Sequence, residues 1–172
     1  ISELVLKDYR NMVSVVSQDI YLFNSSIRDN ICMYKDIDDK FIMEACKDSG
    51  LADFISEVSL DYVVGQNGAM LSGGQKQKIA LARALVQNSP IVIFDEATSN
   101  TDVYSEQQIN GLLHTKLKEK TVIIITHKQE ILREADQIIL LKDGIVIGTG
   151  RYDDLIKSNV DFKDMINMAE RY

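Results

Sequence analysis

The sequence predicts an α/β fold in which parallel strands alternate with helices. Apolar, β-rich runs are separated by stretches with helical periodicity, which is the pattern of a parallel sheet joined by crossover helices. Ile and Val dominate two of these runs, Ile91–Asp95 and Thr121–Thr126, so we expect strands that are covered on both faces of the sheet. A chain of 172 residues, 45% of them hydrophobic, is large enough for one domain with an ordinary core.

Five segments have the length and composition of strands. In chain order they are residues 13–17, 91–95, 121–126, 137–141 and 145–148. The last two are separated by Lys142-Asp143-Gly144, whose residue types favour a tight turn. We therefore expect these two strands to form a hairpin.

More than seventy residues between the first two strands carry no strand signal, which is too many for a loop in a compact domain. We expect a helical insertion there. Asp38 and Asp39 can cap one helix that ends at Ser49-Gly50, and a second is predicted from Gly73 to about Gln87. The inward positions are Ile42, Ala45 and Cys46 in the first helix and Ile79, Ala82, Leu85 and Val86 in the second, whose polar positions include Lys76, Lys78 and Arg83. Further helices are predicted at residues 103–118, 153–156 and 162–171.

Composition argues against several classes of partner. A net charge of -7 and a pI near 4.8 disfavour nucleic-acid binding, which needs clustered Lys and Arg. No apolar run reaches the length of a membrane-spanning helix, and the start has no signal-peptide pattern, so we expect a soluble chain. Cys32 and Cys46 lack metal-ligand spacing and suit a reducing compartment, where they are expected to be small buried residues.

Ser72-Gly73-Gly74-Gln75 begins the second predicted helix and has two interpretations. Ser-x-x-Gln before an apolar helix is a capping box, which is common. The same geometry also offers backbone N–H groups and the positive end of the helix dipole, while two glycines allow an anion to approach the backbone. The second interpretation predicts a phosphate site.

Asp95 and Glu96 stand at the carboxyl end of the second strand, where an α/β sheet binds its ligands. They could simply cap a helix. Adjacent acids after a buried strand, however, repel one another unless a cation offsets their charge, so this pair indicates a metal-dependent site.

Together these motifs resemble ATP-binding cassette (ABC) ATPases. Met70–Gln77 resembles the signature motif of this family, Ile91–Ser99 its Walker B strand, and Val16–Asp19 its Q-loop. Ser99–Asp102 is similar to the D-loop, although Asn100 and Thr101 depart from the usual pattern. The resemblance implies a P-loop NTPase (RecA-like) parallel sheet formed by residues 1–18 and 91–150, a helical signature subdomain at 19–90 and C-terminal helices at 151–172.

The resemblance also implies ATP and Mg²⁺ as cofactors and a role for each site residue. Asp95 and Gln18 would contact magnesium, and Glu96 would orient or deprotonate the attacking water. His127 occupies the position of the switch histidine that contacts the γ-phosphate, although a lone histidine is more often structural. Ser72, Gly73, Gly74 and Gln75 would face the ATP of a partner subunit in a head-to-tail dimer with a second ABC ATPase domain, and Asp102 would lie at that interface.

No segment reads G-x-x-x-x-G-K-[ST], the P-loop that this family uses to hold the β- and γ-phosphates. We therefore expect a chain that is truncated before the Q-loop and that, by itself, hydrolyses ATP negligibly. In the family topology the P-loop strand lies between the strand ending at His127 and the strand near Ile138–Leu141. Its loss predicts unpaired strand edges.

Two further runs indicate the branch of the family. Gln18–Phe23 and Ser26–Ile31 resemble exporters of peptides, lipids or drugs whose transmembrane and ATPase parts are fused. The resemblance implies that Gln18–Phe23 contacts a transmembrane domain at the cytoplasmic face of a membrane, unless Tyr21, Leu22 and Phe23 are simply core residues. Val64–Gly68 is similar to the X-loop, with Gln66 where Glu is usual.

Two alternatives remain. One is a non-transport ABC ATPase of DNA repair, chromosome organisation or translation, which the exporter-like runs and the acidic charge disfavour. The other is a non-hydrolysing module that supplies only a signature half-site to its partner. Glu96 and His127 argue against the latter, because a chain without catalysis has no need of them.

Overall fold

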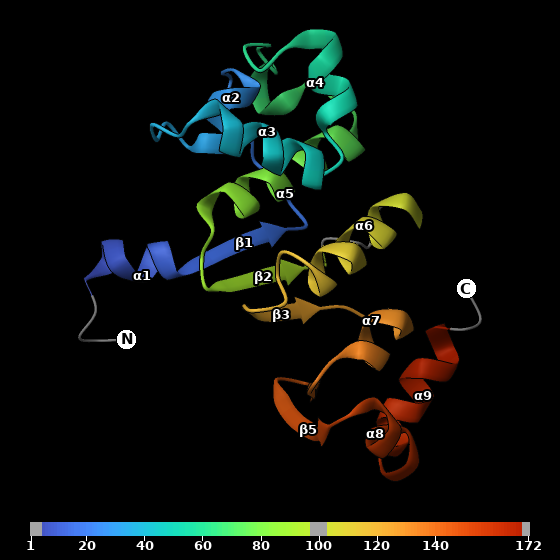
Figure 1. Ribbon diagram of the computed structural model, residues 1–172. Coiled ribbons are helices and arrows are strands. Elements are labelled where there is room, and N and C mark those ends of the chain that lie inside the picture. Colours follow the sequence, from blue (N-terminus) through green and yellow to red (C-terminus); the bar gives the residue numbers. More distant parts are fainter. Residues whose placement is uncertain (1–4, 97–102, 170–172) are drawn as a thin grey trace. The chain divides into compact units, whose positions relative to one another are not determined.

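The computed structural model describes residues 5–96 and 103–169, and the chain divides into two compact units, Ile1–Ile125 and Thr126–Tyr172. The first unit combines a parallel sheet with a helical part, and the second combines a hairpin with helices (Figure 1). The predicted α/β class, with a parallel sheet and a helical insertion, is confirmed.

The parallel sheet has three strands in the order β1 (Val13–Ser17), β2 (Ile91–Asp95) and β3 (Thr121–Ile125). The register aligns Val15, Ile93 and Ile123. The other face of the sheet packs on helices α5 (Gly73–Gln87) and α6 (Val103–His114). The buried residues of this contact are Val16, Val92 and Phe94 from the sheet and Ala80, Leu81, Ala84, Ile109 and Leu112 from the helices.

The expectation of cover on both faces is wrong for β3 in the described chain, whereas Ile91 and Ile93 of β2 are half-buried. The side chains of Val15, Ile123 and Ile125 are 54%, 49% and 50% exposed. Among the described elements, the two helices that pack on the sheet, α5 and α6, both contact the opposite face. Within the described part of the first unit, one apolar face of the sheet is therefore about half exposed.

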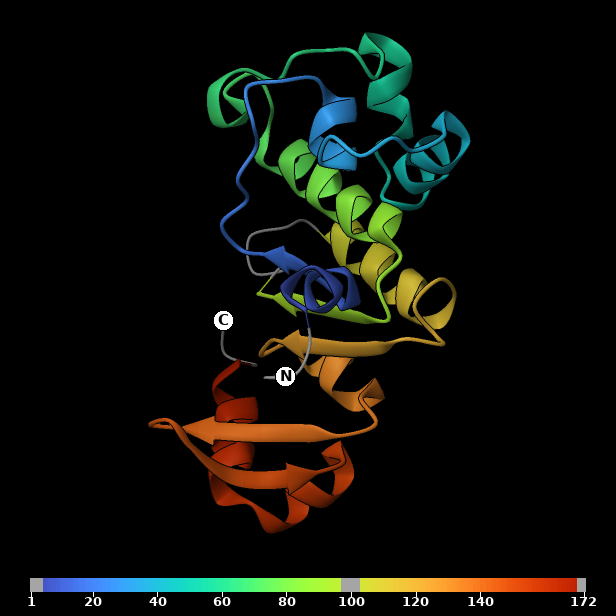
Figure 2. The same cartoon turned by 90° about the vertical axis from the view of Figure 1, so that its left-hand side faces the viewer.

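The helical part contains α2 (Ile27–Cys32), α3 (Asp39–Asp48), α4 (Ala52–Val58), the 3-10 turn η1 (Gln66–Gly68) and α5. α3 and α5 confirm the two predicted helices, and the Asp38 carboxylate caps α3 by accepting the Lys40 N–H at 2.8 Å. Ile79 and Ala82 of α5 pack in the helical core, whereas the sheet-facing residues of α5 belong to the core under the sheet. α5 therefore joins the two cores and lies between the sheet and the other helices (Figures 1 and 2).

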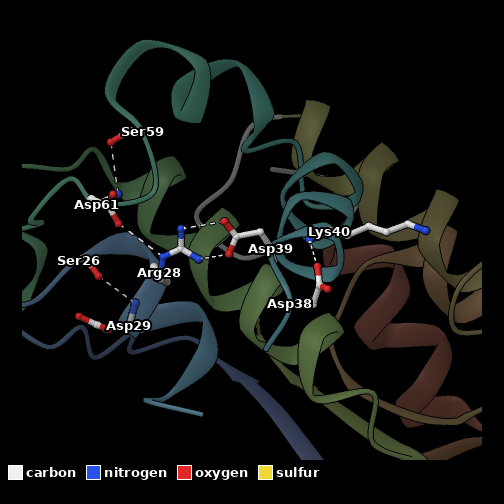
Figure 3. Close-up of polar contacts among 8 residues, drawn as sticks. All are labelled: Ser26, Arg28, Asp29, Asp38, Asp39, Lys40, Ser59 and Asp61. Carbon is white, nitrogen blue, oxygen red and sulfur yellow. Dashed lines mark hydrogen bonds and ion pairs between the residues drawn. The ribbon is translucent and has the colours of Figure 1, made fainter. Parts of the chain in front are cut away.

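The surface of the helical part carries a small group of ion pairs centred on Arg28 (Figure 3). Its guanidinium pairs with Asp39, and Nε lies 3.5 Å from an Asp61 carboxylate oxygen. The hydrogen bonds that Arg28 donates to the Asp39 carboxylate raise the pKa of Arg28 and lower the pKa of Asp39. The two carboxylates are largely exposed and the Arg28 side chain is partly exposed, so solvent screening keeps their contribution to stability small.

The second unit contains α7 (Gln129–Glu134), β4 (Ile138–Lys142), β5 (Ile145–Gly150), α8 (Tyr152–Ser158) and α9 (Val160–Ala169). β4 and β5 form the predicted antiparallel hairpin, whose turn places Asp143 and Gly144 at positive φ. The buried core of this second unit comprises Leu132, Ile138, Leu140, Tyr152, Leu155, Phe162 and Ile166. Among the described strands, β3 pairs with β2 and β4 pairs with β5, so β3 and β4 are not neighbours in one sheet.

The remaining helices follow the predictions approximately. α6 ends at His114, four residues before the predicted end, and α8 and α9 each begin earlier than predicted. α1 (Leu6–Met12) precedes β1 and was not predicted. Its seven residues are too few for a clear helical pattern.

Candidate functional site

The N-terminus of α5 is built by the predicted capping box. The Ser72 hydroxyl accepts the Gln75 N–H at 3.2 Å, and the Gln75 side-chain oxygen accepts the Ser72 N–H at 2.8 Å. A serine hydroxyl keeps its own proton when it accepts a bond, so the Ser72 O–H can still donate to a ligand. The capping interpretation is confirmed, and it leaves the phosphate interpretation open.

Gly73 and Gly74 lie in the first turn of α5 and are exposed. A methyl group built on either one would meet no atom within 4 Å among the described residues, and neither residue has a positive φ. Gly68 differs, since its φ is +66° and its methyl group would lie 2.7 Å from Leu22 Cδ1. The described fold therefore requires glycine at 68 but not at 73 or 74, where the helix end is open to an approaching group.

Asp95 ends β2 with an exposed side chain, and Glu96 follows it with a left-handed φ of 47°. The Glu96 N–H donates to the carbonyl of Ile125 at 3.1 Å, which ties this residue to the end of β3. α6 begins only at Val103, so neither acid lies in its first turn. This placement disfavours the helix-capping interpretation. A left-handed glutamate costs about 1–2 kcal/mol, which is typical of strain at a functional position.

Gln18 and the acidic pair leave neighbouring strands at one edge of the sheet. Ser17 is the register partner of Asp95, so Gln18 and Glu96 each follow one member of this pair. Gln18 is exposed. Asp95 and Gln18 supply oxygen donors of the kind that Mg²⁺ prefers. The described residues contain no group of three or more His, Cys, Asp and Glu side chains that could hold an ion by themselves, so these donors fit a magnesium that is also held by phosphate and water.

His127 lies two residues beyond the end of β3, in the second compact unit, and its side chain is exposed. The D-loop residues Asn100 and Asp102 lie outside the described residues.

The segment Tyr21–Phe23 is neither wholly core nor wholly surface. Tyr21 is 64% exposed, Leu22 is 1% exposed and Phe23 is half-buried. The Tyr21 and Phe23 rings meet edge to face with centroids 5.3 Å apart, and Tyr34 extends this aromatic group at 5.9 Å from Phe23. Tyr34 was missed because it lies eleven residues beyond Phe23, as the second of two consecutive left-handed residues, Met33 and Tyr34, that no local sequence pattern predicts.

Comparison with known proteins assigns the fold to a family. A family model described as ABC transporter matches residues 1–99, more than half of the chain. This chain belongs to the ABC transporter family. Its parallel sheet and helical insertion are accordingly those of an ABC ATPase, a P-loop NTPase fold.

Several relatives are exporters or flippases. The chain is 40% identical over 159 residues to the ATP-dependent lipid A-core flippase of Escherichia coli (strain K12), which covers 90% of this chain and 27% of that protein. The flippase of the same description from Shigella flexneri gives the same values. The solved structure of a bacterial Atm1-family ABC exporter with ATP bound matches with a TM-score of 0.91 and 33% identity, covering 98% of this chain and 30% of that one.

The chain thus spans less than a third of the length of the relatives that it matches. Among the described residues, no helix has the length and apolar character needed to cross a bilayer.

Proposed function

We propose that this chain forms most of the nucleotide-binding domain of an ABC exporter and that it works in a head-to-tail dimer with a second ABC ATPase domain. The observation that carries this proposal is the open N-terminus of α5. Neither steric crowding nor backbone conformation in the described fold requires glycine at positions 73 and 74, which follow the N-cap serine of α5. Glycines at such a place allow a phosphate to approach the helix end closely. Ser72, Gly73 and Gly74, with Gln75 bonded to Ser72 in the capping box, would contact the γ-phosphate of ATP held by the partner domain.

The acidic edge of the sheet supplies the second half of the proposed chemistry. MgATP supplies both the phosphates and the magnesium ion. Asp95 and Gln18 would hold this magnesium at the carboxyl ends of β2 and β1. Glu96 would orient the attacking water or accept its proton, and His127 would contact the γ-phosphate. Phosphoryl transfer depends mainly on positioning and charge neutralisation, so these polar groups are sufficient once a P-loop holds the nucleotide.

The uncovered face of the sheet supports the need for that P-loop part. Parallel sheets are normally covered on both faces, whereas Val15, Ile123 and Ile125 are about half exposed here. β3 also has one edge without a strand among the described residues. We infer that a P-loop strand and its following helix, supplied by another polypeptide segment, complete this sheet. Without them the chain would hydrolyse ATP negligibly.

The aromatic group of Tyr21, Phe23 and Tyr34, in which both tyrosines are exposed, would contact the transmembrane part of the exporter at the cytoplasmic face of the membrane. Tyr21 and Phe23 follow the proposed magnesium ligand Gln18 by three and five residues in the chain. The transported substrate is proposed to be a lipid, since the flippase relatives are named for lipid A-core. Peptides and drugs are the other substrate classes that exporters of this type would carry.

A Glu96→Gln substitution in the complete protein tests this function. The proposal predicts that kcat for MgATP falls at least about 100-fold while ATP binding persists, because the amide keeps the shape of the side chain but cannot accept a proton. Glu57→Gln, on the exposed surface of α4, is the matched control and should leave turnover unchanged. Unchanged turnover in the Glu96→Gln variant would refute the assigned role. A wild-type protein that binds ATP without hydrolysing it would favour the half-site module instead.

A further inference from the structure

The backbone of Tyr21–Phe23 is held by side chains from three different elements of the helical region. These three residues lie in neither a helix nor a strand. An irregular segment keeps a fixed course only where its polar backbone groups find partners. Here the partners are Arg83 of α5, Asn30 of α2 and Asn67 of η1.

Arg83 joins two segments with one guanidinium group. Its Nε donates to the carbonyl of Asn30 at 2.8 Å, and Nη1 and Nη2 both donate to the carbonyl of Tyr21 at 3.3 Å. These acceptors are neutral, and burial lowers the pKa of the half-buried guanidinium. A planar, forked donor suits this arrangement, whereas a lysine ammonium would act as a single point donor.

The Asn30 side chain binds the backbone of Phe23, two residues after Tyr21. This side chain is fully buried, its Oδ1 accepts the Phe23 N–H at 2.8 Å, and its Nδ2 donates to the Phe23 carbonyl at 3.0 Å. Both backbone groups of Phe23 are thereby satisfied, as they would be by a neighbouring strand. The hydrogen bond from Arg83 to the Asn30 carbonyl fixes Asn30, and with it Phe23, to α5.

Asn67 connects the same segment to the beginning of α5. Its Oδ1 accepts the Leu22 N–H at 3.3 Å, and its backbone carbonyl accepts Lys76 Nζ at 2.9 Å. The residue has a left-handed φ of 49°, a conformation that Asn tolerates better than most residues. Leu22 is also packed closely over Gly68, so little room remains for it to shift.

We infer that Arg83 is a positioning residue which, with Asn30 and Asn67, makes the segment Tyr21–Phe23 and the signature end of α5 move as one body. This inference rests on the proposed function. Arg83 lies ten residues beyond Gly73, or about 15 Å along the helix axis. It is therefore too far along α5 to contact a phosphate bound at the N-terminus. Its role is to transmit displacement between the signature end of α5 and the segment Tyr21–Phe23.

Hydrogen exchange of the complete protein, with and without MgATP and vanadate, tests this coupling. In the wild type we expect trapping to slow exchange in peptides covering residues 70–76 and to change exchange in those covering 20–26. Arg83→Lys should retain the response at 70–76, lose the response at 20–26 and raise basal exchange there at least fivefold. Arg28→Lys, which alters the exposed ion pairs of Figure 3 on the same helical part, is the matched control and should behave as the wild type does.

If Arg83→Lys does not fold, a second variant tests the same coupling between residues 20–26 and 70–76. Asn67→Gly keeps the left-handed backbone accessible and removes the acceptor for Leu22, so it should also uncouple residues 20–26 from trapping. A persistent response at 20–26 in the folded variants, or no response there in the wild type, would overturn the inference. Absence of a wild-type response at 70–76 would instead contradict the proposed function.

Discussion

Cys46 is fully buried in α3, and this burial raises the pKa of its thiol to about 11 from an ordinary 9.0. A nearby thiol, Cys32, adds to the effect, and burial raises the pKa of Cys32 as well. Both residues lie in the helical core, as the interpretation as small buried residues predicted. High pKa and burial together make these thiols poor nucleophiles.

The raised pKa of Cys46 predicts a loss of stability at alkaline pH. Below about pH 9 the thiol is protonated in both the folded and the unfolded chain, so its burial has no pH-dependent cost. Between about pH 9 and about pH 11 the unfolded thiol loses its proton while the folded thiol keeps it, and the free energy of unfolding falls by on the order of 1–3 kcal/mol. Urea denaturation across this range measures the fall.

Cys46→Ala is the control for that titration, because lysines and tyrosines ionise over the same range. The wild type should lose stability more steeply than the variant between these pH values. Parallel curves for the two proteins would show that burial does not hold the proton on this thiol.

At the site, sequence patterns could predict which residues matter but not how they are held. The positions of Asp95 and Glu96 follow from a buried strand that ends in two acids. The left-handed conformation of Glu96 and its bond to Ile125 depend on the approach of β3, which no local pattern encodes. Arg83 fell on the polar face of a predicted helix, and its partners lie 53 and 62 residues away in the chain.

At the scale of elements, α5 carries the clearest prediction. Gly73→Ala and Gly74→Ala should each raise the free energy of unfolding by roughly 0.5–1 kcal/mol, because alanine favours the helix and its methyl group meets no described atom. The same substitutions should lower MgATP turnover of the complete protein at least tenfold by blocking the approach of phosphate. Thermal denaturation and steady-state turnover measure the two effects.

Gly68→Ala supplies the opposite control. Its methyl group would collide with Leu22, and its φ is left-handed, so this variant should lose roughly 1–3 kcal/mol of stability. If Gly73→Ala or Gly74→Ala destabilised the fold as Gly68→Ala does, their glycines would be structural and the phosphate interpretation would lose its main support.

The elements that were predicted well have strong local signals. α3 and α5 begin at side-chain caps and repeat apolar residues with helical spacing, and β1 and β2 have the predicted boundaries. α2, α4 and α7 have only six or seven residues each, too few to establish a helical period. Burial on one face only could not be predicted, because an Ile-rich strand has the same composition whether or not its second face is covered.

At the scale of the whole molecule, the uncovered sheet predicts self-association of the 172-residue chain. Val15, Ile123 and Ile125 expose apolar surface beside the edge of β3, and such edges pair readily with another chain. Ile123→Lys with Ile125→Lys should reduce the sedimentation-velocity signal of oligomers. Lys substitution at Tyr34, which is exposed on the helical part, is the control and should not reduce it. A monomeric wild-type chain that binds no hydrophobic dye would contradict this account.

We propose that this chain supplies part of an ATP-hydrolysing site and that a P-loop part completes it. The most direct test is steady-state MgATP turnover of the complete protein beside that of the 172-residue chain, each purified with its Glu96→Gln variant to exclude contaminating enzymes. We expect Glu96-dependent turnover by the complete protein and none above background by the chain alone. Equal Glu96-dependent turnover by the two, or none by the complete protein, would contradict it.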